Sequence, residues 1–102
     1  MIARHWRGLA KASSGEAYIE HLRSETFPAL THVAGFVSAS ILRRPAGDAV
    51  EFVIVTHWES LAAIHAFAGA NAEEAVVPAK VHDMMIEYDR VVRHYEVVTG
   101  TC

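Results

Sequence analysis

The residues Phe52-Val53-Ile54-Val55 are the most informative stretch of this 102-residue chain. Successive side chains of a β-strand point to opposite faces of the sheet, so four consecutive apolar residues predict a strand that is covered on both faces. A strand with one face in water would alternate apolar and polar residues instead. We therefore expect Val50 to Trp58 to form a central strand.

A turn places a second strand beside this one. The segment 45–48, Pro-Ala-Gly-Asp, holds three turn-forming residues. Residues 36–44 before the turn and the strand from Val50 after it therefore predict a β-hairpin. Gly35 marks the break at which the hairpin begins.

The segment before the hairpin predicts a strand and a helix. Residues 2–10 alternate imperfectly between apolar and polar and are expected to form a strand. Ser13 and Glu16 have the spacing of a capping box, in which each side chain takes up a free backbone N–H at the start of a helix. Apolar residues at helical spacing continue to Val33, and Pro28 is expected to kink this helix or to end its regular part.

The segment after the hairpin predicts further helices and a last strand. Ser60 is a typical N-cap and Gly69 a typical helix end, which predicts a helix between them. Two shorter helical pieces are expected at 72–77 and 80–88, and residues 90–98 are expected to form the last strand.

The order strand, helix, strand, strand, helix, strand predicts an α+β, ferredoxin-like fold. Right-handed connections give an antiparallel four-stranded sheet in the order 4-1-3-2, with both helices on one face. The other face stays bare, which conflicts with a central strand that is apolar on both sides. We therefore expect a homodimer that pairs sheet against sheet. Residues 1–98 are expected to form one domain, and residues 99–102 a flexible C-terminal tail.

Charge and composition exclude several classes of protein. Lysine and arginine number 9 against 12 aspartate and glutamate, for a formal net charge of −3, and no basic run exceeds Arg43-Arg44, so no nucleic-acid partner is expected. No run approaches the roughly 20 apolar residues of a membrane span, and the charged start of the chain is unlike a signal peptide. We expect a cytoplasmic protein without a membrane partner. The single cysteine, Cys102, allows no internal disulfide.

The seven histidines invite a metal site, but none stands in His-x-His or His-Glu-x-x-His spacing, so no metal is expected. His5, His57 and His94 fall on predicted strands. Each either pairs with a neighbouring side chain or faces a pocket, where a histidine pKa near neutrality suits a general base. The other four are expected to be solvated surface residues: His21, His32, His65 and His82.

Aromatic residues gather on the predicted central strands. Trp6 and Trp58 lie on the first and third strands, which are neighbours in the predicted sheet, so they either share one cavity or fill the core. Phe67 lies on the predicted helix above them. The sequence holds no glycine-rich nucleotide motif and no nucleophile-elbow motif, so we expect no bound cofactor and no serine-hydrolase chemistry.

Five stretches of the chain carry a family resemblance. They are Ile-Ala-Arg-His-Trp-Arg-Gly (2–8), Trp-Glu-Ser (58–60), Ile-His-Ala-Phe-Ala-Gly (64–69), Ala-Val-Val-Pro (75–78) and Arg-His-Tyr-Glu-Val (93–97). Together they resemble the antibiotic biosynthesis monooxygenase family of dimeric α/β-barrel proteins, over nearly the whole chain. Such a resemblance is more specific for the fold than for the activity, because one fold hosts several functions.

The resemblance implies a dimeric α/β barrel with an apolar cavity between sheet and helices, suited to a flat aromatic molecule. Characterised relatives oxidise phenolic or quinol-type compounds with O₂ and without metal or flavin, because an electron-rich phenolate or carbanion can itself reduce O₂. We therefore expect a cofactor-independent monooxygenase that acts on a small aromatic or quinol-type compound, with His94 and His5 as catalytic residues. The expected substrate-binding residues are Trp6, Trp58, Phe67 and Tyr95. The alternative is a non-catalytic dimeric barrel that serves as a ligand-binding or stress-associated module.

The wider superfamily that the resemblance points to includes haem-degrading enzymes. Their members use an asparagine on the first strand, a tryptophan on the second helix and, further along that helix, a histidine as axial ligand. The corresponding positions of this sequence hold Trp6, Phe67 and Val77. Haem degradation is therefore disfavoured, although His82 lies close enough for a shift of alignment to supply the histidine.

Overall fold

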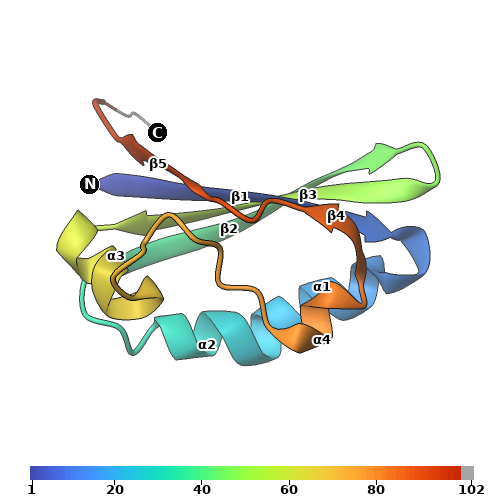
Figure 1. The fold of residues 1–102 in the computed structure, drawn as a ribbon, viewed down its shortest axis with the longest axis horizontal. Helices are drawn as coiled ribbons and strands as arrows, with labels where there is room; N and C mark the ends of the chain where they lie inside the picture. Colours follow the sequence, from blue (N-terminus) through green and yellow to red (C-terminus); the bar gives the residue numbers. More distant parts are fainter. Residues whose placement is uncertain (100–102) are drawn as a thin grey trace.

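The computed structural model describes residues 1–99, which form one antiparallel sheet with helices on one side of it (Figure 1). The strands are β1 (Ile2–Lys11), β2 (Phe36–Ala46), β3 (Ala49–Trp58), β4 (Met85–Tyr88) and β5 (Arg93–Glu96). The helices are α1 (Gly15–His21), α2 (Phe27–Leu30), α3 (Leu61–Ala68) and α4 (Ala79–His82), with a 3₁₀ turn, η1 (Ala12–Ser14), and a π-helical turn, η2 (Leu22–Thr26). Among residues 1–99 no helix is long and apolar enough to cross a membrane. The predicted tail, 99–102, lies outside the described residues apart from Thr99.

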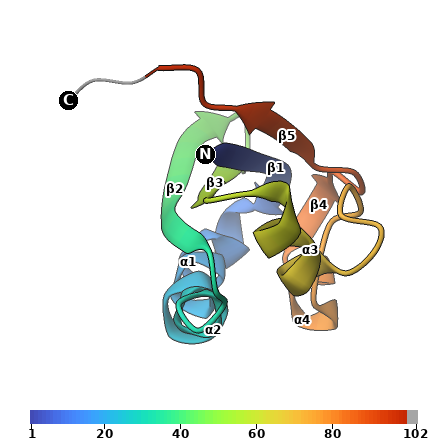
Figure 2. The same cartoon turned by 90° about the vertical axis from the view of Figure 1, so that its left-hand side faces the viewer.

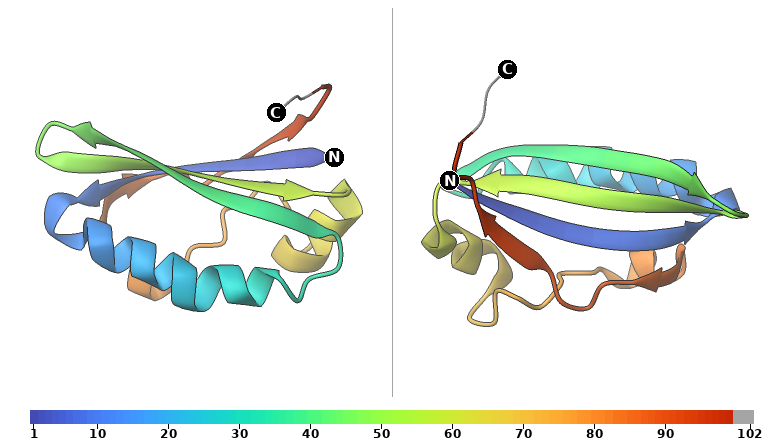
Figure 3. Two further views of the ribbon diagram at one scale, coloured as in Figure 1. Left: turned by 180° about the vertical axis from the view of Figure 1, so that it is seen from behind. Right: turned by 90° about the horizontal axis from the view of Figure 1, so that it is seen from above.

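The sheet has the predicted strand order. β2, β3, β1 and β4 follow one another across it, and β5 pairs with the other end of the same edge of β1. All of these pairings are antiparallel, and β3 and β1 lie at the centre of the sheet seen from above in Figure 3. The ferredoxin-like fold and the order 4-1-3-2 are confirmed, with β4 and β5 together in the place of the fourth strand.

The hairpin between β2 and β3 is also confirmed. Its strands run closer to the turn than predicted, and Ala46 pairs with Ala49 across it. Gly47 has φ +62°, a left-handed conformation that glycine adopts without steric cost. This two-residue turn sets the register of the two strands.

The apolar residues 52–55 of β3 point alternately to the two faces of the sheet. Phe52 and Ile54 point toward the helices and are 0% and 8% exposed. Val53 and Val55 therefore point to the opposite face, which we call the outer face. All the helices lie on the inner side in Figures 1 and 2, so within residues 1–99 no helix covers the outer face.

The first helix does not begin with the predicted capping box. Ser13 lies in η1, and the N-cap position before α1 is taken by Ser14 without a side-chain hydrogen bond. The Glu16 carboxylate instead accepts a hydrogen bond from Arg43 on β2, at 3.1 Å. Within the 3₁₀ turn the backbone N–H of Gly15 donates to the carbonyl of Ala12, so this N–H at the start of α1 needs no capping side chain.

The expected effect of Pro28 is confirmed. Regular α-helix ends at His21, and the wider π-helical turn η2 lies directly before α2, which holds Pro28 near its first residue. The N–H of Phe27 bonds to the carbonyl of Leu22, five residues back. Pro28 has no N–H to continue the four-residue pattern, so the helix widens before it.

The helix predicted after Ser60 is confirmed at both ends. The Ser60 hydroxyl accepts a hydrogen bond from the N–H of Ala63 at 3.2 Å, as an N-cap does. Gly69 follows α3 with φ +87°, and its N–H donates to the carbonyl of His65 at 2.8 Å. Serine and glycine therefore fix the limits of α3.

The helix predicted at 72–77 is wrong. This segment is irregular and lies alongside the chain near residue 90, where the N–H of Ala75 donates to the carbonyl of Arg90 at 2.8 Å. Backbone groups that pair with a distant segment are not available to a helix. The β-branched residues before Pro78 also favour extended backbone.

The helix predicted at 80–88 is wrong in its second half. Only Ala79–His82 is helical, and Met85–Tyr88 forms β4 on the edge of β1. The last strand, predicted at 90–98, is limited to Arg93–Glu96. The free edge of β1 offers these residues backbone partners that the end of a short helix would lack.

Candidate functional site

A cavity of about 450 Å³ lies between the sheet and the helices. Inner side chains of β1 and β3 form one wall, and the helical segment from residue 18 and the chain at 76–81 form the others. Most of the lining side chains are apolar, and Trp6 and Tyr18 are among them. The remaining polar side chains in the wall are Arg4, His21, Glu25, Thr26 and Thr56.

The alternation of β1 brings Trp6 into this wall. The indole Nε1 donates to the carbonyl of Asp89 at 2.9 Å, and the ring lies between Tyr18 and Tyr88, with centroids 6.1 Å from each. Gly8, two residues on, leaves the space that the ring fills, because a Cβ there would lie 2.4 Å from the indole. The structure therefore places Trp6, one of the predicted substrate-binding residues, in the wall of the cavity.

Arg4, on the same face of β1, is buried in the wall with 5% of its surface exposed. Its Nη1 donates to the carbonyl of Ala72 at 2.5 Å and to Nε2 of His94 at 2.8 Å, and its Nη2 donates to the carbonyl of Glu74 at 3.2 Å. The guanidinium lies 5.7 Å from the centre of the Phe67 ring. Burial lowers the pKa of Arg4, yet a guanidinium remains charged at neutral pH.

His94 lies behind Arg4 rather than in the cavity wall. The two residues are cross-strand partners on β5 and β1 and lie on the same face of the sheet. Because Arg4 can only donate, Nε2 of His94 accepts and the ring is neutral. Burial and then the charge of Arg4 lower the pKa of His94, while Glu73 acts in the opposite sense. The ring is therefore placed to orient Arg4.

Phe67 and Trp58 form a stack at one end of the cavity. Phe67 lies in the wall, and Trp58 lies behind it with ring centroids 5.4 Å apart and planes 23° apart. Trp58 is 0% exposed, and its Nε1 donates to the hydroxyl of Thr56 at 2.8 Å. Of the two residues, Phe67 is the one placed to touch a ligand, and Trp58 supports it.

His5 and Tyr95 lie on the outer face, away from the cavity. Their rings meet edge to face at 5.0 Å, and His57 lies beside them on β3. Burial and then the charge of His57 lower the pKa of His5. The outer face therefore holds two of the six predicted site residues. His5 and Tyr95 are each next in sequence to a residue whose side chain points to the inner face, and successive side chains of a strand point to opposite faces.

His21 is the histidine that reaches the cavity wall, although it was expected to be solvated. It is 6% exposed, with Nδ1 at 3.2 Å from the Glu25 carboxylate and Nε2 at 3.3 Å from the Thr26 hydroxyl. Lys80 contacts the same carboxylate at 2.6 Å, and Lys80 first and then His21 hold the pKa of Glu25 below its usual range. The signal was present in the sequence, since His21 follows the buried Tyr18 by three residues on one helix face.

The described part of the chain brings together no three His, Cys, Asp or Glu side chains in the manner of metal ligands. The cavity instead combines apolar and aromatic walls with two polar groups of different character. One is the cation Arg4 on the sheet, and the other is the His21–Glu25 pair on the helix. Such a site suits an aromatic molecule with one polar end.

Comparison with known proteins places the chain in a family. The model of the antibiotic biosynthesis monooxygenase family matches residues 1–78, which is most of the chain. No functionally curated protein matches it.

Solved structures share the fold over the full length. A candidate antibiotic biosynthesis monooxygenase from Bacillus cereus is 19% identical with a TM-score of 0.72, and the match covers 100% of this chain and 95% of that one. The haem degrader MhuD from Mycobacterium tuberculosis, solved with two haems in its active site, is 22% identical with a TM-score of 0.65, over 98% and 99%. A second candidate monooxygenase, from Deinococcus radiodurans, is 16% identical with a TM-score of 0.67, over 100% and 97%. By the family match and the shared fold, this chain belongs to the antibiotic biosynthesis monooxygenase family.

Proposed function

We propose that this protein is a cofactor-independent monooxygenase that oxidises a small aromatic or quinol-type compound with O₂ in the cavity. Membership of a family that includes monooxygenases supports this chemistry. The observation that carries the proposal is the His21–Glu25 pair in a mostly apolar wall. A histidine held by a carboxylate has the arrangement of a general base.

The proposed reaction needs a base, a holder for the ring and protection from water. With Nδ1–H donated to Glu25, Nε2 of His21 is the nitrogen that would take a proton, after a substrate has replaced the Thr26 hydroxyl that lies 3.3 Å from it. For an anthrone-like methylene group, the resulting carbanion passes electrons to O₂. One oxygen atom becomes the new carbonyl and the other leaves as water. The aromatic walls hold the ring and exclude solvent.

The strand histidines have less support as bases. His94 accepts a hydrogen bond from Arg4 and stands behind it, so its Nε2 is occupied. His5 lies on the outer face, where a second copy of the chain would have to bring the substrate to it. We therefore assign the proton transfer to His21, with Trp6 and Phe67 as ring contacts.

The residues of the cavity do not fit a haem. Haem iron takes His, Cys, Met or Tyr as axial ligand. Both nitrogens of His21 are engaged, and burial raises the pKa of Tyr18, which keeps its phenol protonated. The exposed His82 bonds to the carbonyl of Val77 and is not part of the wall, while Val77 itself lines it.

The proposal includes a homodimer formed through the outer face, as in the dimeric barrels that the sequence resembles. The supporting observation is an exposed apolar spot on that face, where Leu42 is 52% exposed beside Val53. The second candidate function is a non-catalytic dimeric barrel that binds its ligand without turnover. The engagement of both nitrogens of His21 favours this candidate.

Oxygen uptake tests the function directly. A panel of hydroquinones and anthrone-like phenols is offered to the protein, with heat-killed protein as control. We expect uptake with at least one compound, loss of at least tenfold in His21→Gln, and wild-type rates in His32→Gln, whose histidine is exposed on the loop after α2. Absence of uptake above the control across the panel would leave only the non-catalytic barrel.

A further inference from the structure

Arg4 is a buried cation without an acidic partner. Among residues 1–99 no aspartate or glutamate oxygen lies within 4 Å of its guanidinium, and its partners are two backbone carbonyls and the neutral ring of His94. The arginines on the outer face, in contrast, pair with carboxylates. Buried charges in proteins are ordinarily paired, so the unpaired charge of Arg4 requires an explanation.

The rest of the wall does not neutralise this charge. Glu25 is the carboxylate that lines the cavity, and it is bound to Lys80 at 2.6 Å and to His21 at 3.2 Å. Phe67 contributes the face of its ring to Arg4, which favours a cation but carries no net charge. Within the described residues the wall of the cavity is therefore positive at its sheet side.

The guanidinium also keeps donors for a ligand. It has five N–H groups, and the two bonds from Nη1 and the single bond from Nη2 use three of them. Nε–H and the second Nη2–H make no hydrogen bond within residues 1–99. A guanidinium with two spare N–H groups matches the two oxygens of a carboxylate or the single oxygen of a phenolate.

We propose that the cavity binds an aromatic molecule with one anionic oxygen group, carboxylate or phenolate, and that Arg4 holds this group while His94 positions Arg4. The aromatic part of the ligand lies against Trp6 and Phe67, which line the same cavity. This inference rests on the proposed function in that it names the substrate class of the same site.

The competing role for Arg4 is purely structural. Its bonds to Ala72 and Glu74 tie the irregular segment after α3 to β1, and this alone would explain a buried arginine. The two roles differ in what they predict for a ligand. If Arg4 is only structural, a charged and a neutral ligand of the same shape bind with equal affinity. If Arg4 is an anion site, the anionic ligand binds more tightly.

Binding of a matched pair of probes to the wild-type protein makes the first test, and it needs no variant. The probes are 2-naphthoate and its neutral amide, 2-naphthamide, measured by titration calorimetry at pH 7. A charge-assisted contact in a buried site leads us to expect that naphthoate binds at least about tenfold more tightly. Equal affinities, or no binding of either probe, would overturn the proposal.

A variant then assigns the preference to Arg4. In Arg4→Gln we expect naphthoate to lose its advantage while naphthamide binds as before, which also shows that the cavity is intact. The matched control is Arg23→Gln, an exposed arginine of η2, where the tenfold preference persists. A preference that survives in Arg4→Gln would place the anion elsewhere. If Arg4→Gln does not fold, the wild-type pair of probes still decides the outcome.

The binding test separates this inference from the proposed function, because naphthoate is not an oxidisable quinol. A preference for naphthoate without O₂ uptake in the panel would support the anion site and reject the oxygenase. O₂ uptake with quinols but no preference for naphthoate would support the oxygenase and reject the anion site.

Discussion

Gly8 leaves room for the ring of Trp6, which lines the cavity. Its missing side chain is the space in which the indole of Trp6 lies, and a Cβ there would meet the ring at 2.4 Å and the Met85 sulfur at 3.0 Å. Glycine within a strand often marks such a close approach. The position of Trp6 in the wall therefore depends on a residue that touches no ligand.

Gly8→Ala is expected to displace Trp6 and to destabilise the protein by about 1–3 kcal/mol, as overpacking of a core does. Urea unfolding followed by tryptophan fluorescence measures both effects. The control is Gly15→Ala at the start of α1, where a new Cβ meets only Val50 at 3.7 Å and φ is −55°. A Gly8→Ala protein as stable as Gly15→Ala would contradict the assigned role.

The site residues show what sequence can and cannot predict at this scale. Alternation along β1 shows that Arg4 and Trp6 share one face and that His5 lies on the other, but not which face meets the helices. That choice depends on which face the helices and the distant segment around Val81 cover. His21 was missed although its three-residue spacing from Tyr18 places it on the same face of the helix.

At the scale of elements, the two serines predicted to cap helices differ in outcome. Ser60 caps α3 through the N–H of Ala63, whereas Ser13 lies in a 3₁₀ turn and caps nothing. We expect Ser60→Ala to cost about 1 kcal/mol of unfolding free energy, and Ser13→Ala to be close to neutral. Denaturant midpoints of the two variants provide the measurement, and equal losses would be inconsistent with these caps.

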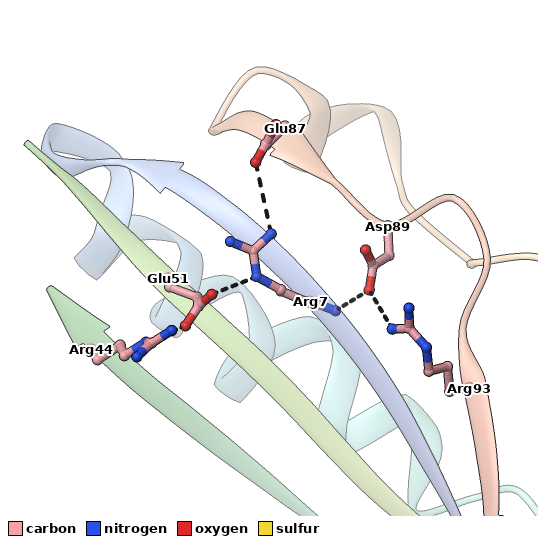
Figure 4. Close-up of polar contacts among 6 residues, drawn as sticks. All are labelled: Arg7, Arg44, Glu51, Glu87, Asp89 and Arg93. Carbon is pink, nitrogen blue, oxygen red and sulfur yellow. Dashed lines mark hydrogen bonds and ion pairs between the residues drawn. The ribbon is translucent and has the colours of Figure 1, made fainter. Parts of the chain in front are cut away.

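An ion-pair network crosses four strands on the outer face. Glu51 on β3 binds Arg7 on β1 at 2.5 Å and Arg44 on β2, as Figure 4 shows. Arg7 also approaches Glu87, and its backbone N–H donates to Asp89 at 3.2 Å. The network joins neighbouring strands at the end of the sheet that carries the hairpin.

The network predicts a pH dependence. Arg44 first and then Arg7 lower the pKa of Glu51, so its contribution to stability is present above the unfolded pKa of about 4.3 and is lost as the pH falls through the lower folded value. Glu51→Gln should therefore be less stable than wild type at pH 7, and the difference should vanish in acid. Glu20→Gln, at an exposed helical position, is the control and should show no such trend. Thermal unfolding across the pH range tests this.

The elements predicted correctly are those that are specified by residues within or next to the element itself. Turn residues at 45–48 and the apolar run at 52–55 specify the hairpin, and Ser60 with Gly69 specifies α3. The segment from 72 to 88 was predicted poorly because its backbone pairs with β1 and with residues near 90, and a partner so distant leaves no local periodicity. The division of the fourth strand into β4 and β5 was not predicted for the same reason, because both pair with the distant β1.

For the whole molecule, the two faces of the sheet have different roles. The inner face carries the cavity with Arg4 and Trp6, and the outer face presents apolar residues together with the ion-pair network. The conflict found in the sequence, a strand apolar on both sides in a fold covered on one, is thus present in the structure. A second copy of the chain on the outer face would resolve it.

Sedimentation tests the proposed dimer. We expect a particle of twice the 11.2 kDa chain mass at micromolar concentration. Leu42→Glu on the outer face should shift it to monomer, while Leu61→Glu on α3, which is similarly exposed, should not. A wild-type monomer at that concentration would contradict the pairing of the sheets.

The central claim is that the inner cavity binds an aromatic anion through Arg4. A crystal structure of the protein with 2-naphthoate tests this most directly. We expect the naphthalene ring between Trp6 and Phe67 and a carboxylate oxygen within hydrogen-bond distance of the Arg4 guanidinium. Naphthoate bound on the outer face, or in the cavity with its carboxylate turned away from Arg4, would contradict it.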